Sequence, residues 1–356
     1  MARALQLARR GMYTTQPNPR VGSVLVKDRK IVAQGWHERA GGPHAEIAAL
    51  LDAGSAARGA DCYVTLEPCV HFGRTPPCAN ALIDAGVARV VAAMTDPNPL
   101  VSGRGMQLLA GAGIPAASGL MQAEAAEINR GFVMRMSAGR PFVRCKLALS
   151  ADEFTSGGDS AGQWITGEAA RADVQRLRAE SCAVLTGIGT VLADDPRLNV
   201  RGGDWGGRQP LRAVLDRKLR FPAVAAMLKL PGRTLIFTRD SEPGRQAELR
   251  AAGAEIVRLG GIDIDFVDAA LKYLAEKEQV NEVIVEAGTT LANALLSMRR
   301  VDELVVYQSR TLLGEQGRLP FHLSAPAGNS GYMKLTDRRA VGQDWRLTFR
   351  RATDHH

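Results

Sequence analysis

The sequence predicts an α/β protein built from two successive domains. In the first half, strand-like and helix-like runs follow one another in the order β-β-α-β-α-β, which is typical of layered α/β domains. The run Ser137-Ala138-Gly139-Arg140-Pro141 interrupts this pattern, and the alternation restarts at residue 142. We therefore expect a first domain over residues 1–138 and a second over residues 139–356, since a chain of 356 residues can form two cores.

Local patterns predict each element of the first half. β-rich runs on both sides of Lys27-Asp28-Arg29 indicate a hairpin, and Gly86 is expected to end an apolar helix. The expected elements are an opening helix near residues 5–12, strands 21–26 and 31–34, helix 44–51, strand 61–66, helix 78–85, strand 87–94, and helices 106–112 and 123–136.

The second half reads in the same way. The expected elements are strand 142–149, helix 167–180, strands 183–187, 211–216, 234–238 and 283–286, and late antiparallel strands at 304–308 and near 346–350. The glycine-rich stretch over residues 202–207 is expected to form a flexible loop.

Composition limits the functional classes. Hydrophobic residues make up 46% and charged residues 23%, as in ordinary globular proteins. The net charge of +8 has three interpretations: an ordinary basic surface, phosphorylated small molecules, or nucleic acid. An aromatic content of 5% and the lack of a dense Lys/Arg run argue against a nucleic-acid stacking surface. We expect no membrane partner, because no apolar run reaches the ~20 residues of a span and no signal-peptide core is present.

The cysteines point to a reducing compartment. Five cysteines are an odd and small number for a disulfide scaffold. Cys62, Cys145 and Cys182 lie in apolar strand-like runs and are expected in the core. We therefore expect a cytoplasmic protein whose remaining cysteines, Cys69 and Cys78, are metal thiolates.

Three short motifs carry recognisable chemistry: Pro43-His44-Ala45-Glu46, Glu67-Pro68-Cys69 and Pro77-Cys78. One histidine and two cysteines can hold zinc and leave a fourth position open for water, which is the catalytic pattern. The glutamate two residues after the histidine suits a general acid/base, as in the zinc deaminase signature H-x-E…P-C-x-x-C. The spacing departs from that signature, because eight residues rather than two separate the cysteines.

Each expected ligand stands at the end of an element. His44 begins a helix, Cys69 follows a strand, and Cys78 begins the next helix, where the helix dipole stabilises a thiolate. The sequence therefore predicts one Zn²⁺ per chain held by these three residues, with Glu46 carrying the proton. A chance grouping of core residues and a closed structural zinc site with His71 as fourth ligand stay open.

The segment between the cysteines, Val70-His71-Phe72-Gly73-Arg74-Thr75-Pro76-Pro77, is the most specific part of the pattern. With QPNPRVG at residues 16–22 and DPNP at 96–99, it closely resembles the deaminase half of the bacterial RibD family of riboflavin biosynthesis. The resemblance implies a cytidine-deaminase-like three-layer α/β/α domain that deaminates 2,5-diamino-6-ribosylamino-4(3H)-pyrimidinone 5′-phosphate. It also implies that the pyrimidine and phosphate pocket is lined by Asn18, His37, His71, Arg74 and Asn98.

The second half lacks the usual nucleotide fingerprints, because neither G-x-G-x-x-G nor a P-loop pattern occurs. Gly158-Asp159-Ser160-Ala161-Gly162 matches G-x-S-x-G. The hydrophobic strand that a nucleophile elbow needs does not precede it, so we expect no nucleophile there.

The second half instead resembles the reductase domain of the same family, which has a dihydrofolate-reductase-like α/β fold. The matching segments are residues 140–146 (RPFVRCK), 164–167 (WITG), 187–196 (GIGTVLADDP) and 286–290 (EAGTT). The resemblance implies reduction of the ribosyl group to ribityl with NADPH, whose phosphates backbone N–H groups near the glycines would approach. The residues expected around substrate and cofactor are Lys146, Trp164, Thr166, Gly187, Thr190, Asp194, Asn199, Arg201, Glu286 and Gly288.

Two positions depart from the family pattern. Ser150-Ala151-Asp152-Glu153-Phe154 replaces S-L-D-G-R/K, and Glu286-Ala287-Gly288 replaces E-G-G. A Cβ at residue 153 or 287 restricts φ where glycine would not. The departures therefore motivate an alternative in which an active deaminase carries a degenerate reductase domain.

The leading hypothesis is a bifunctional deaminase and reductase. A second hypothesis is a nucleic-acid base deaminase with an accessory domain, and the deaminase with a degenerate reductase domain is the third. Under the leading hypothesis the partners are phosphorylated pyrimidine substrates, with no nucleic acid, and we expect a homo-oligomer.

Overall fold

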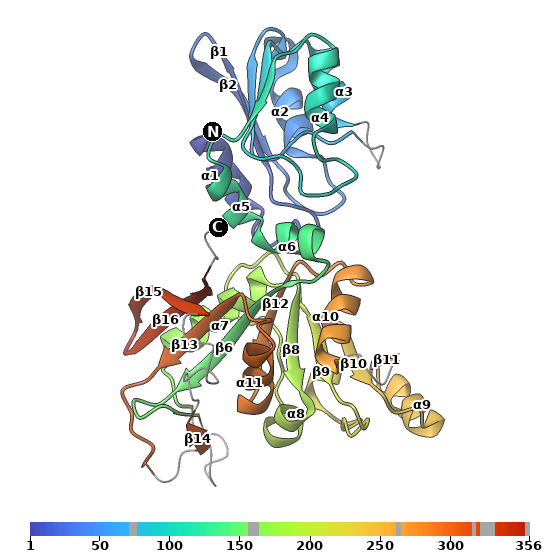
Figure 1. The fold of residues 1–356 in the computed structure, drawn as a ribbon, viewed down its shortest axis with the longest axis vertical. Coiled ribbons are helices and arrows are strands. Elements are labelled where there is room, and N and C mark those ends of the chain that lie inside the picture. Colours follow the sequence, from blue (N-terminus) through green and yellow to red (C-terminus); the bar gives the residue numbers. More distant parts are fainter. Residues whose placement is uncertain (71–76, 156–163, 261–264, 315–317, 321–331, 353–356) are drawn as a thin grey trace. The chain divides into compact units, whose positions relative to one another are not determined.

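The computed structural model describes residues 1–70, 77–155, 164–260, 265–314, 318–320 and 332–352. The chain divides into two compact units, Met1–Arg140 and Pro141–His356, each with its own sheet (Figure 1). Among the described residues, no helix has the length and apolar character needed to cross a membrane.

The first unit contains a five-stranded sheet in the order β2-β1-β3-β4-β5. The hairpin β1–β2 and the pair β1–β3 are antiparallel, whereas β3, β4 and β5 run parallel. The elements are α1 (Ala2–Arg10), β1 (Gly22–Lys27), β2 (Lys30–Trp36), α2 (Ala45–Ala53), β3 (Asp61–Val64), α3 (Cys78–Ala85), β4 (Arg89–Ala92), α4 (Arg104–Gly111), β5 (Ala116–Ser118), α5 (Gln122–Ile128) and α6 (Arg130–Ala138).

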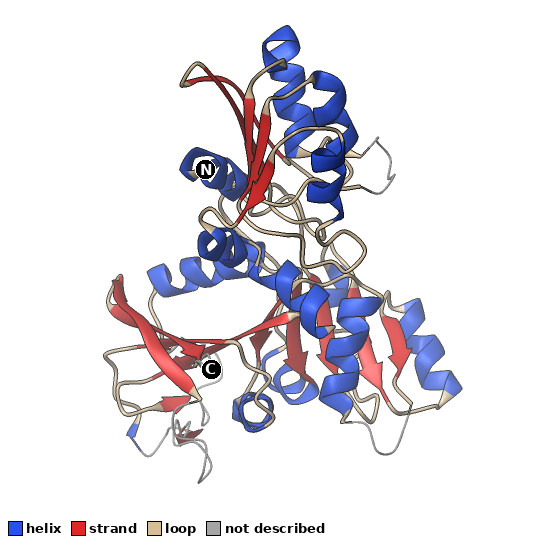
Figure 2. Cartoon of the chain, turned by 45° about the horizontal axis from the view of Figure 1, so that its top comes forward, coloured by secondary structure: helices blue, strands red, loops and turns tan. Residues whose placement is uncertain are grey.

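Helices cover both faces of this sheet (Figure 2). Alternation along β1 explains why, because Val24 packs with Leu7 of α1 on one face and Leu25 packs with Ala45 and Ala49 of α2 on the other. The first unit is therefore the three-layer α/β/α domain that the sequence predicted.

One predicted helix is wrong in detail. The helix expected over residues 123–136 is interrupted at Asn129, which separates α5 from α6. The Asn129 side chain accepts from the Arg20 backbone N–H at 2.7 Å and donates to the Arg20 carbonyl at 2.9 Å. Because these partners are 109 residues apart in the chain, helical periodicity could not predict the break.

The second unit contains a nine-stranded sheet in the order β11-β10-β9-β8-β12-β6-β13-β16-β15. The strands from β11 to β13 are parallel, and β16 and β15 add antiparallel strands at one edge, as predicted for the tail. A short ladder joins β7 and β14. The elements are β6 (Phe142–Leu149), β7 (Phe154–Thr155), α7 (Glu168–Glu180), β8 (Ala183–Gly187), α8 (Ile188–Asp194), β9 (Leu211–Leu215), β10 (Thr234–Thr238), α9 (Pro243–Ala251), β11 (Glu255–Arg258), α10 (Phe266–Glu276), β12 (Glu282–Glu286), α11 (Thr289–Ser297), β13 (Glu303–Gln308), β14 (Arg318–Pro320), β15 (Met333–Val341) and β16 (Asp344–Arg351).

Both faces of the parallel strands are buried. Along β12, Val283 and Val285 join the core beneath α10 and α11, while Ile284 joins the opposite core with Leu177 of α7. Strands covered on both faces are expected to be apolar at successive positions, as at residues 283–285 in the middle of β12.

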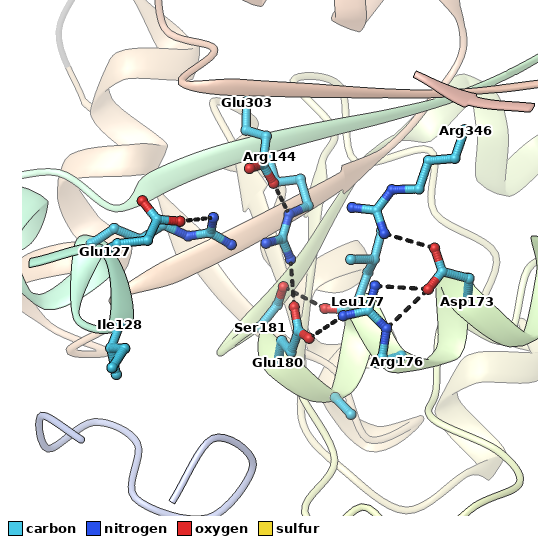
Figure 3. Close-up of polar contacts among 12 residues, drawn as sticks. Glu127, Ile128, Arg144, Asp173, Arg176, Leu177, Glu180, Ser181, Glu303 and Arg346 are labelled. Atoms are coloured by element: carbon cyan, nitrogen blue, oxygen red, sulfur yellow. Dashed lines mark hydrogen bonds and ion pairs between the residues drawn. The ribbon is translucent and has the colours of Figure 1, made fainter. Parts of the chain in front are cut away.

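A line of alternating charges, partly buried, connects α7 to the sheet (Figure 3). Neighbours along the line are joined by ion pairs of 2.5 to 3.3 Å, in the order Glu303, Arg144, Glu180, Arg176, Asp173 and Arg346. Removing one member would leave an uncompensated charge. The line therefore favours a single position of α7 on the sheet.

Candidate functional sites

The three residues that the sequence singled out as metal ligands meet in the first unit at the start of two helices. His44 is the N-cap residue of α2, and Cys78 is the first residue of α3. Cys69 lies in the loop after β3, where its sulfur accepts the Cys78 backbone N–H at 3.4 Å. His44 Nδ1 lies 3.2 Å from Cys78 Sγ and 3.6 Å from Cys69 Sγ.

These separations fit a tetrahedral zinc site. Ordinary Zn–N and Zn–S bonds hold nitrogen and sulfur about 3.6 Å apart around a tetrahedral ion. All three donor atoms lie within 4.8 Å of one another. A hydrogen bond from the Cys78 thiol lowers the pKa of Cys69, so this sulfur readily takes the thiolate form that binds metal.

Glu46 lies beside this cluster, in the first turn of α2. Its side chain is 4% exposed and reaches Cys78. Burial, and then the charge of Cys69, raise the pKa of Glu46 to about 7. A carboxyl group with a pKa near neutrality can both accept and return a proton, as general acid/base chemistry requires.

Two of the expected pocket residues are joined to each other near the metal ligands. Asn18 Nδ2 lies 3.1 Å from His37 Nε2, and His37 Nδ1 lies 2.8 Å from the Pro43 carbonyl. The Pro43 carbonyl accepts from Nδ1–H, which leaves Nε2 to accept the Asn18 amide. Burial lowers the pKa of His37 and favours this neutral form, and its ring meets the His44 ring edge-on, with centroids 5.5 Å apart.

Asn98 is half-buried in the loop after β4. Its side-chain oxygen, Oδ1, accepts the Leu100 backbone N–H at 3.1 Å. His71 and Arg74 lie outside the described residues.

In the second unit, candidate residues gather at the carboxyl ends of β8 and β12. β8 leads through α8 to β9 on one side, whereas β12 leads through α11 to β13 on the other. Open α/β sheets bind ligands at such a topological switch point. Gly187 ends β8 and Gly288 precedes α11, and the Gly288 N–H donates to the Thr190 hydroxyl at 3.3 Å.

Lys146, Glu286 and Arg178 form a buried charged group at the same edge. Glu286 ends β12 and pairs laterally with Lys146 of β6. Arg178 of α7 contacts both carboxylate oxygens of Glu286, at 2.5 and 3.0 Å, and Lys146 Nζ lies 3.5 Å from Oε2. Burial opposes ionisation of Glu286, but the two cations outweigh it and lower the pKa to about 2.

Stability of the second unit is expected to depend on this ion group. Because the folded pKa of Glu286, about 2, lies below its unfolded value of about 4.3, ionisation stabilises the fold fully above pH ~4.5, and the contribution is lost as pH falls towards 2. In urea denaturation, the free energy of unfolding of Glu286→Gln should be lower than that of the wild type by about 3–5 kcal/mol at pH 7. The difference should be much smaller at pH 3. A difference independent of pH would contradict this assignment.

Asn199 and Arg201 lie next to Arg178. Arg178 donates to the Asn199 carbonyl at 2.9 Å, and Arg201 donates to the Asn199 side-chain oxygen at 2.9 Å. Partial burial lowers the pKa of Arg201, and the positive charges of Arg178 and Arg197 lower it further. A group of guanidinium ions that destabilise one another favours an anion such as phosphate.

Three other expected residues do not join this group. Trp164 is 71% exposed, with the Arg171 guanidinium 5.2 Å from its ring. Thr166 is buried, and its carbonyl accepts from the same arginine at 2.7 Å. Asp194 is exposed at the end of α8. In the part of the chain that the structure describes, we find no contact between these residues and Glu286.

The two departures from the family pattern differ in their backbone consequences. Glu153 has a φ of 65°, in the left-handed region, within a turn where Asp152 accepts from the Ser150 hydroxyl at 2.5 Å. Ala287 is not among the described residues with positive φ. A side chain is therefore strained at position 153 and unstrained at position 287.

Glycine at position 153 is expected to relieve that strain. Glu153→Gly should raise the free energy of unfolding of the second unit by about 1 kcal/mol, seen as a Tm increase of roughly 2–4 °C in calorimetry. Glu153→Ala is the matched control, because it removes the carboxylate, keeps the Cβ and should give no gain. A lower Tm for the glycine variant would show that the backbone at Glu153 is not strained.

Sequence reasoning missed Arg178, Arg197 and Glu67 as members of these sites. Arg178 stands 108 residues from its partner Glu286, so no local motif could reveal the pair. Glu67 had a visible signal, because it begins the Glu67-Pro68-Cys69 motif, and its buried carboxylate accepts four backbone N–H groups.

Comparisons with known proteins cover both units. Residues 1–94 match the model of the cytidine and deoxycytidylate deaminase zinc-binding region, and residues 141–347 match that of the RibD C-terminal domain. Riboflavin biosynthesis protein RibD of Escherichia coli (strain K12) is 49% identical over 329 residues, which cover 89% of each chain.

Two solved structures are similar over nearly the whole chain. Acinetobacter baumannii RibD, form 1, matches with a TM-score of 0.90 and 42% identity, covering 99% of this chain and 98% of its own. A diaminohydroxyphosphoribosylaminopyrimidine deaminase/5-amino-6-(5-phosphoribosylamino)uracil reductase from Thermotoga maritima matches with a TM-score of 0.86 and 31% identity, covering 99% and 97%. Because identity of this extent spans both units, the chain belongs to the RibD family.

Proposed function

We infer that this chain is a bifunctional enzyme of riboflavin biosynthesis. Residues 1–138 deaminate 2,5-diamino-6-ribosylamino-4(3H)-pyrimidinone 5′-phosphate, and residues 139–356 reduce the ribosyl group of the product to ribityl with NADPH. The main support for the deaminase activity is the grouping of His44, Cys69 and Cys78 beside Glu46, a buried glutamate with a pKa of about 7.

In the deaminase, His44, Cys69 and Cys78 would hold a zinc ion through three ligands, the number that leaves a fourth position for water. Zinc bound there would make water acidic enough to lose a proton near neutral pH. Glu46 takes that proton and delivers it to a ring nitrogen and then to the leaving ammonia. The carboxyl group is suited to this exchange because burial raises its pKa to about 7, so that it can both accept and release a proton near neutral pH.

The substrate contacts of the deaminase are assigned by chemistry. Asn18, His37 and Asn98 present amide and imidazole groups to the edges of the pyrimidine, and His71 and Arg74 complete the recognition of ring and phosphate. The contacts of His37 support a role in placing Asn18, because its Nδ1 donates to the Pro43 carbonyl and its Nε2 accepts the Asn18 amide.

In the reductase, NADPH supplies the hydride. Gly187, Thr190 and Gly288 lie at the switch point, where backbone N–H groups can approach a dinucleotide. Lys146, held by Glu286, is placed to bind substrate oxygens, and Asn199 and Arg201 lie among the cations suited to its phosphate. We retain Trp164, Thr166 and Asp194 as cofactor or substrate contacts.

The charged group supports an active reductase over a degenerate one. The ion pair from Glu286 keeps Lys146 at the edge of the sheet where the candidate cofactor glycines lie, so the domain retains a placed cation as well as a stable fold. The left-handed turn at Glu153 is also kept despite the missing glycine.

We further propose a cytoplasmic homo-oligomer that acts on small molecules rather than nucleic acid. Its five cysteines are free, which suits a reducing compartment. Light scattering coupled to gel filtration would test the oligomeric state.

One experiment tests both activities. Purified protein is analysed for zinc and then given the deaminase substrate with NADPH, while ammonia release and NADPH oxidation are followed. One zinc per chain and oxidation that depends on prior ammonia release are expected. Ammonia release without NADPH oxidation would leave only the deaminase, and binding of single-stranded nucleic acid with steep salt dependence would favour a base deaminase.

A further inference from the structure

Glu67 connects two loops of the first unit. One is its own loop, which carries the proposed zinc ligand Cys69, and the other covers residues 96–103. Glu67 stands two residues before Cys69, and its side chain is 3% exposed. Both carboxylate oxygens are saturated by backbone N–H donors at 2.8 to 3.3 Å. Oε2 accepts from Asp96 and Gly103, and Oε1 accepts from Gly105 and Met106.

These contacts close the loop over residues 96–103 on itself, because its first and last N–H groups bond to the same oxygen. Inside the loop, the Asp96 carboxylate accepts the Asn98 N–H at 2.8 Å. The loop therefore presents Asn98 from a base that is anchored on Glu67.

The start of α4 is held by the same side chain, because the N–H groups of Gly105 and Met106 donate to Glu67. A Cβ built on Gly105 would lie 2.1 Å from the Pro68 carbonyl oxygen, so only glycine permits this approach. The contact brings α4 against the residue that directly precedes Cys69, and it leaves little freedom between the two loops.

We propose that Glu67 is a positioning residue of the deaminase, which sets Asn98 at a fixed place relative to the zinc ligand Cys69. The proposal rests on the proposed function, in which Asn98 contacts the pyrimidine. A carboxylate is required because it accepts only, with lone pairs for all four donors. Glutamine would turn its NH₂ group towards two N–H donors and leave them unpaired.

The test uses the full-length, zinc-loaded protein with Glu67→Gln. Deaminase kcat/KM is expected to fall at least about tenfold, mainly through a higher KM, because one or more unpaired buried donors displace the loop. Zinc content should stay at the wild-type level, and reduction of the deaminated intermediate should be unchanged. Glu124→Gln, which changes an exposed glutamate on α5, is the matched control and should behave as wild type.

A double-mutant cycle with Asn98→Ala tests whether Glu67 acts through the loop. If it does, Glu67→Gln in the Asn98→Ala background should change kcat/KM by less than about twofold. Fully additive losses, or loss of zinc from Glu67→Gln, would overturn the proposal, because the carboxylate would then act elsewhere or on the metal ligands.

Gly105→Ala is the second variant, and it covers the case in which Glu67→Gln does not fold. This variant displaces α4 from Pro68 but keeps the Glu67 carboxylate. The deaminase KM should therefore rise in the same way while zinc is retained. An unchanged KM overturns the proposal. Wild-type protein without deaminase activity would instead refute the proposed function itself.

Discussion

Replacing Glu46 with glutamine is expected to lower the deaminase kcat by about 100- to 10,000-fold, the usual contribution of a general acid/base, while the zinc content stays unchanged. The side chain keeps its volume in a site where only 4% of it is exposed, so packing is preserved. The change removes a carboxyl group near the cluster whose pKa, about 7, suits proton transfer. Ammonia release and metal analysis on the same preparation measure the two quantities.

Two further observations make this experiment decisive. Glu124→Gln on the exposed face of α5 repeats the same chemical change away from the site and should retain full activity. Reduction of the deaminated intermediate reports on the second unit and should be unaffected. If Glu46→Gln loses zinc, Glu46 is a metal ligand and the assigned role is wrong.

Replacing Lys146 with alanine is expected to reduce NADPH-dependent reduction by roughly 100-fold, because a partly buried cation that binds substrate, as we propose for Lys146, contributes about 2–5 kcal/mol. Deamination should be intact, since Lys146 belongs to the second unit. Glu286 keeps both of its contacts with Arg178, so the carboxylate remains compensated and the unit should fold. Single-turnover NADPH oxidation with the deaminated intermediate measures the effect.

The matched control is Lys272→Ala, at a side chain that is 70% exposed on α10 and paired with Glu276. It removes the same group outside the switch point and should leave reduction unchanged. Equal loss of both activities in Lys146→Ala would argue for one shared site and against two independent ones.

Local signals were enough for much of the fold. β6, β8, β10 and α3 have the bounds that the sequence predicted, because each is an apolar run with a clear end. Gly86 shows the reason for α3, since its φ of 67° is a conformation that glycine adopts without strain. The grouping of the three candidate metal ligands could also be predicted, because His44 and Cys78 stand at helix starts and Cys69 follows a strand in the sequence.

What could not be predicted depends on hydrogen bonds between distant residues. The break at Asn129 follows from its bonds to Arg20, and the ionised state of Glu286 follows from Arg178, which is 108 residues away in the chain. A local pattern reports which face of an element is apolar, but not which polar side chain will meet it from another element. The sequence therefore supplied the chemistry of each candidate site, and only the tertiary structure showed what Glu67 and Arg178 bind and how they hold those sites in place.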